Sequence, residues 1–231
     1  MSATLHVLSA GAAKGLLAAI APRFRAQTGA VIEGTFNAVG TIRQAFTEGA
    51  PCDVLILTAP MLADLARDGA LDPAIAPLGL VATGVAVRRG EPVPAIGDRD
   101  ALHALFDSAR ALYCPDPERA TAGIHFVSVL RALDLWPAAQ AKLRAYASGG
   151  IAMQAMADAN ERGLVGCTQV TEILAVPGVT LVGALPPPFA LTTPYAAGVA
   201  ARAAQPDLAR ALVAMLAGDD ARALREAAGF T

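Results

Sequence analysis

Short apolar runs alternate with helical patterns along the first third of the chain. The run from Leu5 to Ala10 is typical of a strand, and Leu16, Ile20 and Phe24 then recur at helical spacing, with Pro22 expected to cost hydrogen bonding or to bend that helix. The same alternation predicts strands over 30–36 and 53–57 and helices over 41–48 and 60–68. Strands that alternate with helices imply parallel pairing through right-handed crossovers. The pattern therefore predicts an α/β fold with helices on both faces of the sheet.

A change in the pattern of apolar and polar residues after residue 73 indicates a second lobe. The apolar run 80–87 is followed by a charged, proline-rich turn over 88–94. Beyond it the pattern predicts the following elements: helices over 98–108, 121–147 and 151–161, and strands over 111–114, 164–168 and 179–185. Segment 192–201 is interpreted as the return crossing, and helices over 206–216 and 219–228 pack on the first lobe. We predict a discontinuous first lobe, residues 1–80 plus 195–231, and a second lobe, residues 81–194.

Composition limits the classes of partner. The 231 residues are 55% hydrophobic with a formal net charge of -2, so nothing favours nucleic acid or an anionic membrane as a partner. Apolar stretches are interrupted well before they could insert into a membrane. The start, Met1 to Thr4, lacks the features of an export signal. The expected location is cytoplasmic if Met1 is the natural start, and periplasmic, with a transporter permease as possible partner, only if a signal peptide was removed.

The cysteines give no metal or disulfide pattern. Cys52, Cys114 and Cys167 are odd in number and widely spaced, which fits reduced thiols better than a zinc site or a disulfide ladder. We predict no cofactor and no metal.

Ligand loops are expected where parallel strands end, because open α/β sheets bind ligands outside the carboxyl ends of their strands. In the first lobe these loops are 9–15, 37–41 and 57–59, and in the second they are 115–123, 148–150 and 167–169. Several are rich in small or hydroxyl residues and run directly into helices, so free backbone N–H groups would favour an anion. Lys14, Arg43 and Arg119 could add full charge. The alternative interpretation is that these glycines and alanines only make tight turns.

These segments resemble the molybdate-binding proteins of the extracellular solute-binding superfamily, over almost the whole chain. The resemblance is carried by "LHVLSAGAAKGLLAAIAPRFRAQTGAVIEGTFNAVGTIRQAFTEGAPCDVLIL", "PDPERATAGIHFVSVLRALDLW" and "GLVGCTQVTEI". It implies a type II periplasmic-binding-protein fold with two crossing strands as a hinge and a ligand between the lobes. Hydroxyl groups that the resemblance implies in the first two loops are replaced by Ala12 and Val39, and a tyrosine by Gly166. Each lost buried donor costs about 1 kcal/mol or more, which disfavours molybdate.

The remaining polar groups suit an organic carboxylate, with Lys14 and the helix N-termini as counter-charge. The predicted ligand-binding residues are Gly11, Ala12, Ala13, Lys14, Asn37, Val39, Gly40, Thr41, Thr58, Arg119, Thr121, Ala122, Thr168, Gln169 and Tyr195.

Two other function classes stay open. Solute-binding folds similar to this one include the enzyme aconitate isomerase, so an intracellular isomerase acting on a small di- or tricarboxylate is the main alternative to a binding protein. Its acid or base would come from a group near the cleft, although none of them forms a recognisable catalytic set: Asp116, Glu118, His125, Cys114 and Cys167. A sensor that acts through a partner ranks last, because the chain has no helix-turn-helix segment.

Overall fold

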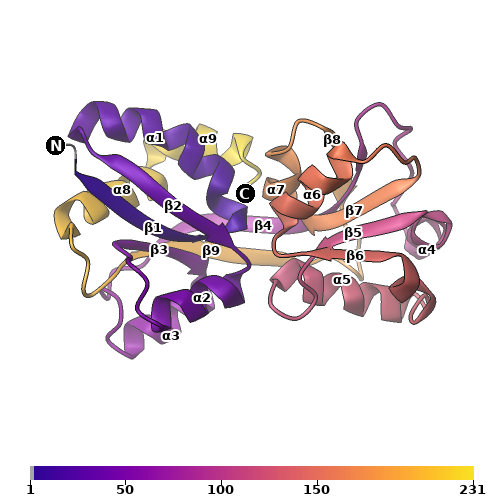
Figure 1. Cartoon of the computed structure of the whole chain (residues 1–231), viewed down its shortest axis with the longest axis horizontal. Coiled ribbons are helices and arrows are strands. Elements are labelled where there is room, and N and C mark those ends of the chain that lie inside the picture. The colour runs from indigo at the N-terminus through magenta and orange to yellow at the C-terminus, as the bar shows by residue number, and fades with distance from the viewer. Residues whose placement is uncertain (1–2) are drawn as a thin grey trace. The chain divides into compact units, whose positions relative to one another are not determined.

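A computed structural model describes residues 3–231, which form two compact units (Figure 1). Unit 1 runs to Val81 and resumes from Thr193 to Thr231, and unit 2 comprises Ala82–Thr192. The chain therefore passes between the units twice, through strand β4 (Ala76–Arg88) and strand β9 (Thr192–Val199).

The sheet of unit 1 has the strand order β2-β1-β3-β9. Strand β1 (Thr4–Ala10) is parallel to β2 (Val31–Asn37) and to β3 (Val54–Thr58), whereas β9 is antiparallel to β3. Every residue of β3 is buried, as expected for a central strand of a sheet covered by helices on both faces. Strand β2 lies at the edge of this order and is largely exposed.

The helices of unit 1 bury an apolar face, except α9, which has no buried residue. They are α1 (Lys14–Thr28), α2 (Val39–Thr47), α3 (Ala59–Arg67), α8 (Pro206–Ala217) and α9 (Arg222–Ala227), with short 3-10 turns at Gly11–Ala13 and Asp219–Ala221. Leu16, Ile20 and Phe24 of α1 pack into the core with the apolar residues of β1 and β3. Helix α1 ends at Gly29, whose φ of 73° is the left-handed conformation that glycine adopts at helix C-termini.

Pro22 lies inside α1 without ending it. The helix continues over fifteen residues, and both Pro22 and Ala18, one turn earlier, face solvent. The carbonyl group of Ala18 that would bond to a residue-22 N–H can therefore be hydrated, which lowers the cost of the proline.

The sheet of unit 2 has the order β4-β7-β5-β6, with β8 (Val179–Ala184) on the other side of β4. Strand β5 (Ala111–Pro115) is parallel to β6 (Leu143–Tyr146) and β7 (Leu164–Gln169), whereas β4 is antiparallel to β7 and β8. Its helices are α4 (Arg99–Ser108), α5 (Thr121–Ala132), α6 (Gly149–Asp158) and α7 (Val170–Leu174). Two apolar clusters hold these elements together.

The helical prediction over 121–147 is wrong in its second half. Helix α5 ends at Ala132, Asp134 has a left-handed φ of 60°, and Pro137 cannot donate a helical hydrogen bond. A 3-10 turn, Ala138–Lys142, then leads into β6, which the sequence analysis missed because its four residues are too few to show a period. Helix α7 was missed for the same reason.

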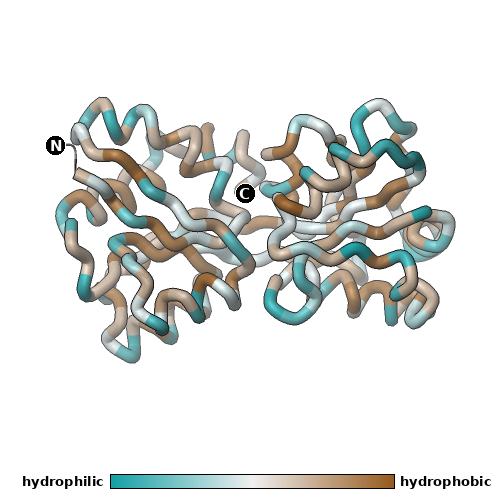
Figure 2. The backbone as a smooth tube through the Cα atoms, viewed as in Figure 1, coloured by the Kyte–Doolittle hydropathy of each residue, from teal (hydrophilic) through white to brown (hydrophobic). Residues whose placement is uncertain are grey.

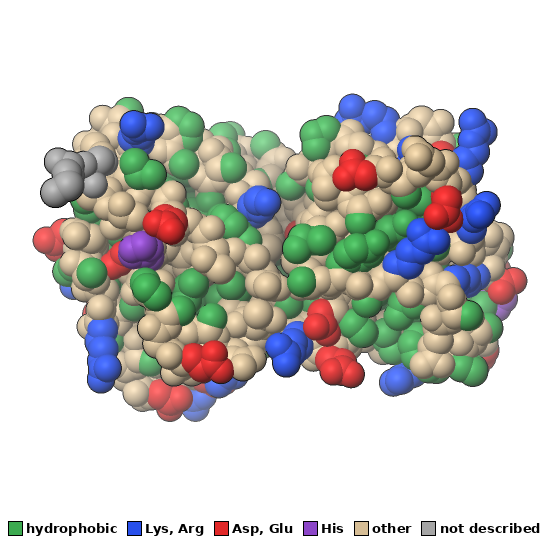
Figure 3. Space-filling view, viewed as in Figure 1, with side chains coloured by type: hydrophobic (Ala, Val, Ile, Leu, Met, Phe, Trp, Pro, Cys, Tyr) green, Lys and Arg blue, Asp and Glu red, His purple; other side chains and the backbone are tan. Residues whose placement is uncertain are grey.

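The surface carries mixed charges over an apolar interior. Figure 2 shows hydrophobic segments along the strands inside each unit, and Figure 3 shows Lys and Arg side chains interspersed with Asp and Glu. Within residues 3–231, no helix has the length and hydropathy needed to cross a bilayer.

Candidate functional site

Three predicted ligand loops of unit 1 follow adjacent strands at one edge of its sheet. The register pairs Ala10 with Asn37 and Ser9 with Ile56, so β1, β2 and β3 end together. Thr58, the last residue of β3, pairs with Tyr195 of β9. Residues 11–14, 37–41, Thr58 and Tyr195 therefore gather at this edge, as the pattern of strands and helices requires.

The helices that begin at this edge have no side-chain cap. The N-cap residues are Ala10 for the 3-10 turn that leads into α1, Ala38 for α2 and Thr58 for α3, and none accepts a hydrogen bond from the helix through its side chain. None of these helices has an acidic residue in its first turn. Alanine is a poor N-cap, so the positive end of each helix dipole is not compensated locally.

The predicted residues at these helix starts differ in exposure. Lys14 is exposed, and its Nζ lies 5.9 Å from the ring centroid of Phe36. Ala12 and Val39 are buried, so they line the helix starts without adding a donor. The Oδ1 of Asn37 accepts a hydrogen bond from the backbone N–H of Ala38 at 2.8 Å, which orders the loop before α2.

In unit 2, helix α5 also begins without a side-chain cap. Its N-cap is Ala120, and its first turn, which contains Thr121 and Ala122, has no acidic residue. The preceding loop is held by Asp116, whose Oδ1 accepts hydrogen bonds from the N–H groups of Glu118 at 2.8 Å and Arg119 at 3.0 Å. Arg119 is exposed next to this helix start. Asp116 thus stabilises the turn before α5.

Helix α6 differs, because its first turn is already satisfied inside the protein. The Oγ of Ser148 accepts the N–H of Ile151 at 3.4 Å, and the Glu172 carboxylate accepts the N–H groups of Gly150, at 3.2 Å, and of Gly149. The expectation of free backbone donors at residues 148–150 is therefore wrong. The acceptor comes from α7, twenty-two residues further along the chain.

Glu172 is the residue of this region that the sequence analysis missed. Its carboxylate is 7% exposed and also accepts the hydroxyl of Thr168 at 2.6 Å and the N–H of Gln169. Burial raises the pKa of this carboxyl above its ordinary value, and the hydrogen bonds from Thr168, Gly150, Gly149 and Gln169 oppose the rise. The only sequence signal was an acidic residue shortly after a strand.

The thiols considered as catalytic groups are poorly suited to that role. Burial raises the pKa of Cys114 to about 12 and that of Cys167 well above its ordinary value. Both thiols therefore stay protonated at neutral pH, and the thiolate is the nucleophilic form. His125 contacts the carbonyl of Phe189 through Nε2 at 2.8 Å, which accounts for it as a packing contact of unit 2.

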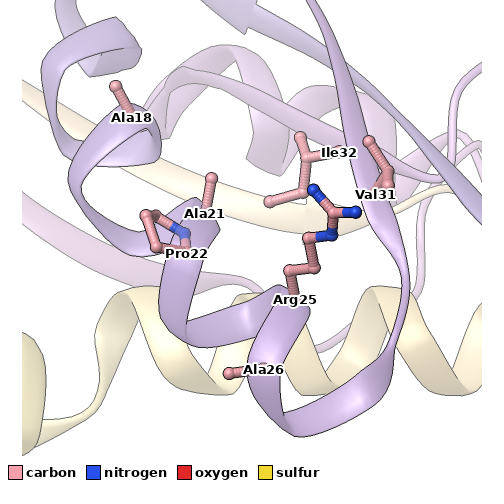
Figure 4. Close-up of a pocket in the computed structure, with 7 residues that line it drawn as sticks. All are labelled: Ala18, Ala21, Pro22, Arg25, Ala26, Val31 and Ile32. Carbon is pink, nitrogen blue, oxygen red and sulfur yellow. The ribbon is translucent and has the colours of Figure 1, made fainter.

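The cavity of Figure 4 lies elsewhere on unit 1. It measures about 680 Å³ and is formed by the second half of α1 and the start of β2, with Arg25 reaching from the helix toward Val31 and Ile32. None of the predicted ligand-binding residues lines it. Among the described residues, no group of three or more His, Cys, Asp or Glu side chains could hold a metal ion.

The fold and these helix starts define a class of protein. Two α/β units joined by two crossing strands make a type II periplasmic-binding-protein fold. Residues 5–231 match the model of a family described as bacterial extracellular solute-binding protein. The chain belongs to this solute-binding family.

The named relatives include one enzyme and two anion-binding proteins. An aconitate isomerase of Pseudomonas sp. is 28% identical over 236 residues, which cover 98% of this chain and 87% of that protein. The periplasmic molybdate-binding protein of Azotobacter vinelandii is 21% identical, with a TM-score of 0.79 and 98% of each chain covered. A sulfate-binding protein of Mycobacterium tuberculosis H37Rv is 19% identical, with a TM-score of 0.74 and coverage of 99% and 86%.

Proposed function

We propose that this protein binds a small organic anion with more than one carboxylate through the helix starts of its ligand loops. The observation that carries the proposal is the set of helix starts without side-chain caps: η1 with α1, α2 and α3 in unit 1, and α5 in unit 2. Each leaves backbone N–H groups and a positive dipole end for an anion.

Helices α4 and α8, away from these loops, each carry an acidic residue in the first turn. Helix α4 is capped by Asp98, which accepts the N–H of Ala101 at 2.9 Å, and carries Asp100 in its first turn. Helix α8 begins with Pro206 and Asp207. A Ser, Asp or Asn cap stabilises a helix by about 1 kcal/mol relative to alanine. Alanine at the starts of α2 and α5 therefore makes these helices less stable than a Ser, Asp or Asn cap would. A bound anion would supply the acceptors that their first N–H groups lack.

The chemistry of these loops favours carboxylates over a compact oxyanion. Ala12, Val39 and Gly166 provide no side-chain hydroxyls, so a tetrahedral anion would lose neutral donors. Lys14 and Arg119 are exposed charged groups that can form charge-assisted hydrogen bonds with separate carboxylates. The likeness to an aconitate isomerase makes a tricarboxylate of the aconitate type the first ligand to test.

The test is calorimetry with cis-aconitate, trans-aconitate, citrate, sulfate and molybdate. We expect a tricarboxylate to bind and Lys14→Ala to weaken its binding by about tenfold, since a charge-assisted contact contributes roughly 1.5 kcal/mol. Arg23→Ala is the matched control, because Arg23 is on the same helix but pairs with Asp220 at 2.9 Å. Binding of none of the acids, or equal loss in both variants, would count against the proposal.

The second candidate is an isomerase that moves a double bond within such an acid, and the aconitate isomerase relative favours it. In this reaction a base removes a proton from a carbon of the acid, the double bond shifts, and a proton returns at another carbon. No electrons are gained or lost. In deuterium oxide the enzyme would place deuterium on carbon as it interconverts the isomers, which proton NMR measures. If the acid binds but neither takes up deuterium nor interconverts, only the binding function remains.

A further inference from the structure

Glu172 holds two predicted ligand loops of unit 2 together. Its Oε2 accepts the hydroxyl of Thr168 at 2.6 Å, and its Oε1 accepts the N–H of Gly150 at 3.2 Å. The N–H groups of Gly149 and Gln169 donate to the same carboxylate. One buried side chain therefore receives donors from both the 148–150 loop and the end of β7.

These contacts account for the start of α6. The N–H groups of Gly149 and Gly150 donate to Glu172, and that of Ile151 donates to Ser148. These are the first three residues of a helix of ten residues, and the N–H of the next, Ala152, donates to the carbonyl of Ser148. An external anion could bind at the start of α6 only by displacing the Glu172 carboxylate.

The local sequence makes room for this carboxylate. A Cβ atom on Gly149 would lie 1.9 Å from Oγ1 of Thr168 and 2.1 Å from Oε2 of Glu172. At Gly150, one residue later, a Cβ would meet nothing within 4 Å. Glycine is thus required at residue 149 because the acid and the hydroxyl approach its backbone closely.

We propose that Glu172 is a specificity-determining residue: as an internal anion at the start of α6, it prevents that helix from accepting an external oxyanion. The ligand must then be bound in unit 2 by α5, whose start at Ala120 is uncapped. The inference rests on the proposed function in assuming that the protein binds an anion through its helix starts.

The protein would therefore select among anions by their shape and by how their charges are distributed. A compact oxyanion needs many donors converging on one point, and the α6 donors are already used. An acid with separated carboxylates can reach the remaining helix starts individually. Glu172 also adds repulsion against a dianion close to α6 whenever it is ionised.

The first test removes the internal anion and supplies a small external one. Glu172→Ala should lower the melting temperature, and formate should restore part of it, by ~3 °C or more, because formate binds only the folded state. Asp98→Ala is the matched control, since it removes the acidic cap of α4, an exposed helix start in the same unit. Chloride at equal ionic strength controls for salt. Equal formate effects in the wild type and both variants would overturn the inference.

The second test addresses specificity directly. Calorimetry should show Glu172→Ala binding molybdate at least ~10-fold more tightly than the wild type does, because the freed N–H groups can donate to it. Unchanged or weaker molybdate binding would overturn the specificity role. If the wild type binds no tricarboxylate but this variant gains formate and molybdate binding, the proposed function fails while the inference about Glu172 stands.

A conservative variant covers the case in which Glu172→Ala does not fold. Glu172→Gln keeps the shape but places an NH₂ group among donors, so at least one backbone N–H of Gly149 or Gly150 loses its acceptor. Amide hydrogen exchange at these two residues should become at least ~10-fold faster, while exchange at Ala101 of α4 stays unchanged. Unchanged protection at Gly149 and Gly150 would overturn the inference.

Discussion

Each unit contains a buried carboxylate that accepts backbone N–H groups. In unit 1, Asp53 is 1% exposed and accepts the N–H of His6 at 2.8 Å and that of Gln205, before α8, at 2.9 Å. In unit 2, Glu172 accepts the N–H groups of the first two residues of α6, Gly149 and Gly150. Asp53 lies just before β3, at the edge opposite the ligand loops, whereas Glu172 follows β7 and lies among them.

The comparison separates two uses of the same chemistry. Asp53 joins β1, β3 and the C-terminal segment, since the backbone of residue 53 also bonds to His6 and Ala200. These contacts give Asp53 a structural role. Glu172 satisfies one helix start at an edge where α5 is left uncapped. A buried acid is therefore informative about function only when its place in the sheet is known.

The largest expected effect on stability comes from removing the buried carboxylate of unit 1, Asp53. Asp53→Ala should lower the free energy of unfolding by about 3 kcal/mol, because two buried N–H groups lose their acceptor. Urea denaturation measures it, and Asp53→Asn, which keeps one carbonyl oxygen, should lose less. The variant should keep its affinity for cis-aconitate under native conditions. A loss of affinity with unchanged stability would place Asp53 in the ligand site instead.

The next effect comes from a pair of neighbouring glycines in unit 2. Gly149→Ala should lower the unfolding free energy by about 2 kcal/mol, since the added Cβ forces Thr168 and Glu172 to move. Gly150→Ala should be neutral or raise it by about 0.5 kcal/mol, because alanine favours a helix and meets open space. Equal effects in urea denaturation would show that the carboxylate does not fill the α6 start.

A smaller change makes α5 resemble α6. Ala120→Ser should raise the unfolding free energy by about 1 kcal/mol by capping α5 and should weaken cis-aconitate binding, because the hydroxyl competes for an N–H group. Ala221→Ser, at the uncapped start of α9 in unit 1, is the matched control for stability without an effect on affinity. Calorimetry and thermal melts compare the two. Unchanged affinity in Ala120→Ser would remove α5 from the site.

The smallest effect is the pH dependence of Glu172. Because burial raises its pKa in the folded state, the native protein keeps a proton that the unfolded chain has already released. The stability of the wild type relative to Glu172→Gln should therefore fall as pH rises from the ordinary glutamate pKa, about 4.3, toward the raised value. Urea denaturation from about pH 4 to about pH 7 measures this difference. A difference that grows with pH would indicate a lowered pKa.

Most of the fold followed from short-range patterns. The apolar run over 53–57 predicted strand β3 to within one residue, and the spacing of Leu16, Ile20 and Phe24 predicted helix α1, because each pattern repeats several times inside its element. Strand β6 and helix α7, of four and five residues, are too short for a period to appear. Their formation depends on neighbours such as β5, with which β6 pairs.

The candidate site was predictable only in part. The alternation of strands and helices placed the ligand loops at the carboxyl ends of the strands, and the fold class is the one expected from the sequence. The sequence offers Ser148 as a cap for α6 and only Ala120 for α5. Loop chemistry alone could not show that the N–H groups of Gly149 and Gly150 are also satisfied, because their acceptor is a side chain on another element.

By itself, the sequence determined the alternation of strands and helices and the alanines at the starts of α2 and α5, because these depend on residues close together in the chain. Only the tertiary structure decided that the start of α6 is filled while that of α5 stays uncapped. Glu172 reaches residues 149 and 150 across more than twenty positions of the chain. A contact of that kind is fixed by the packing of α6, α7 and β7, which no local pattern encodes.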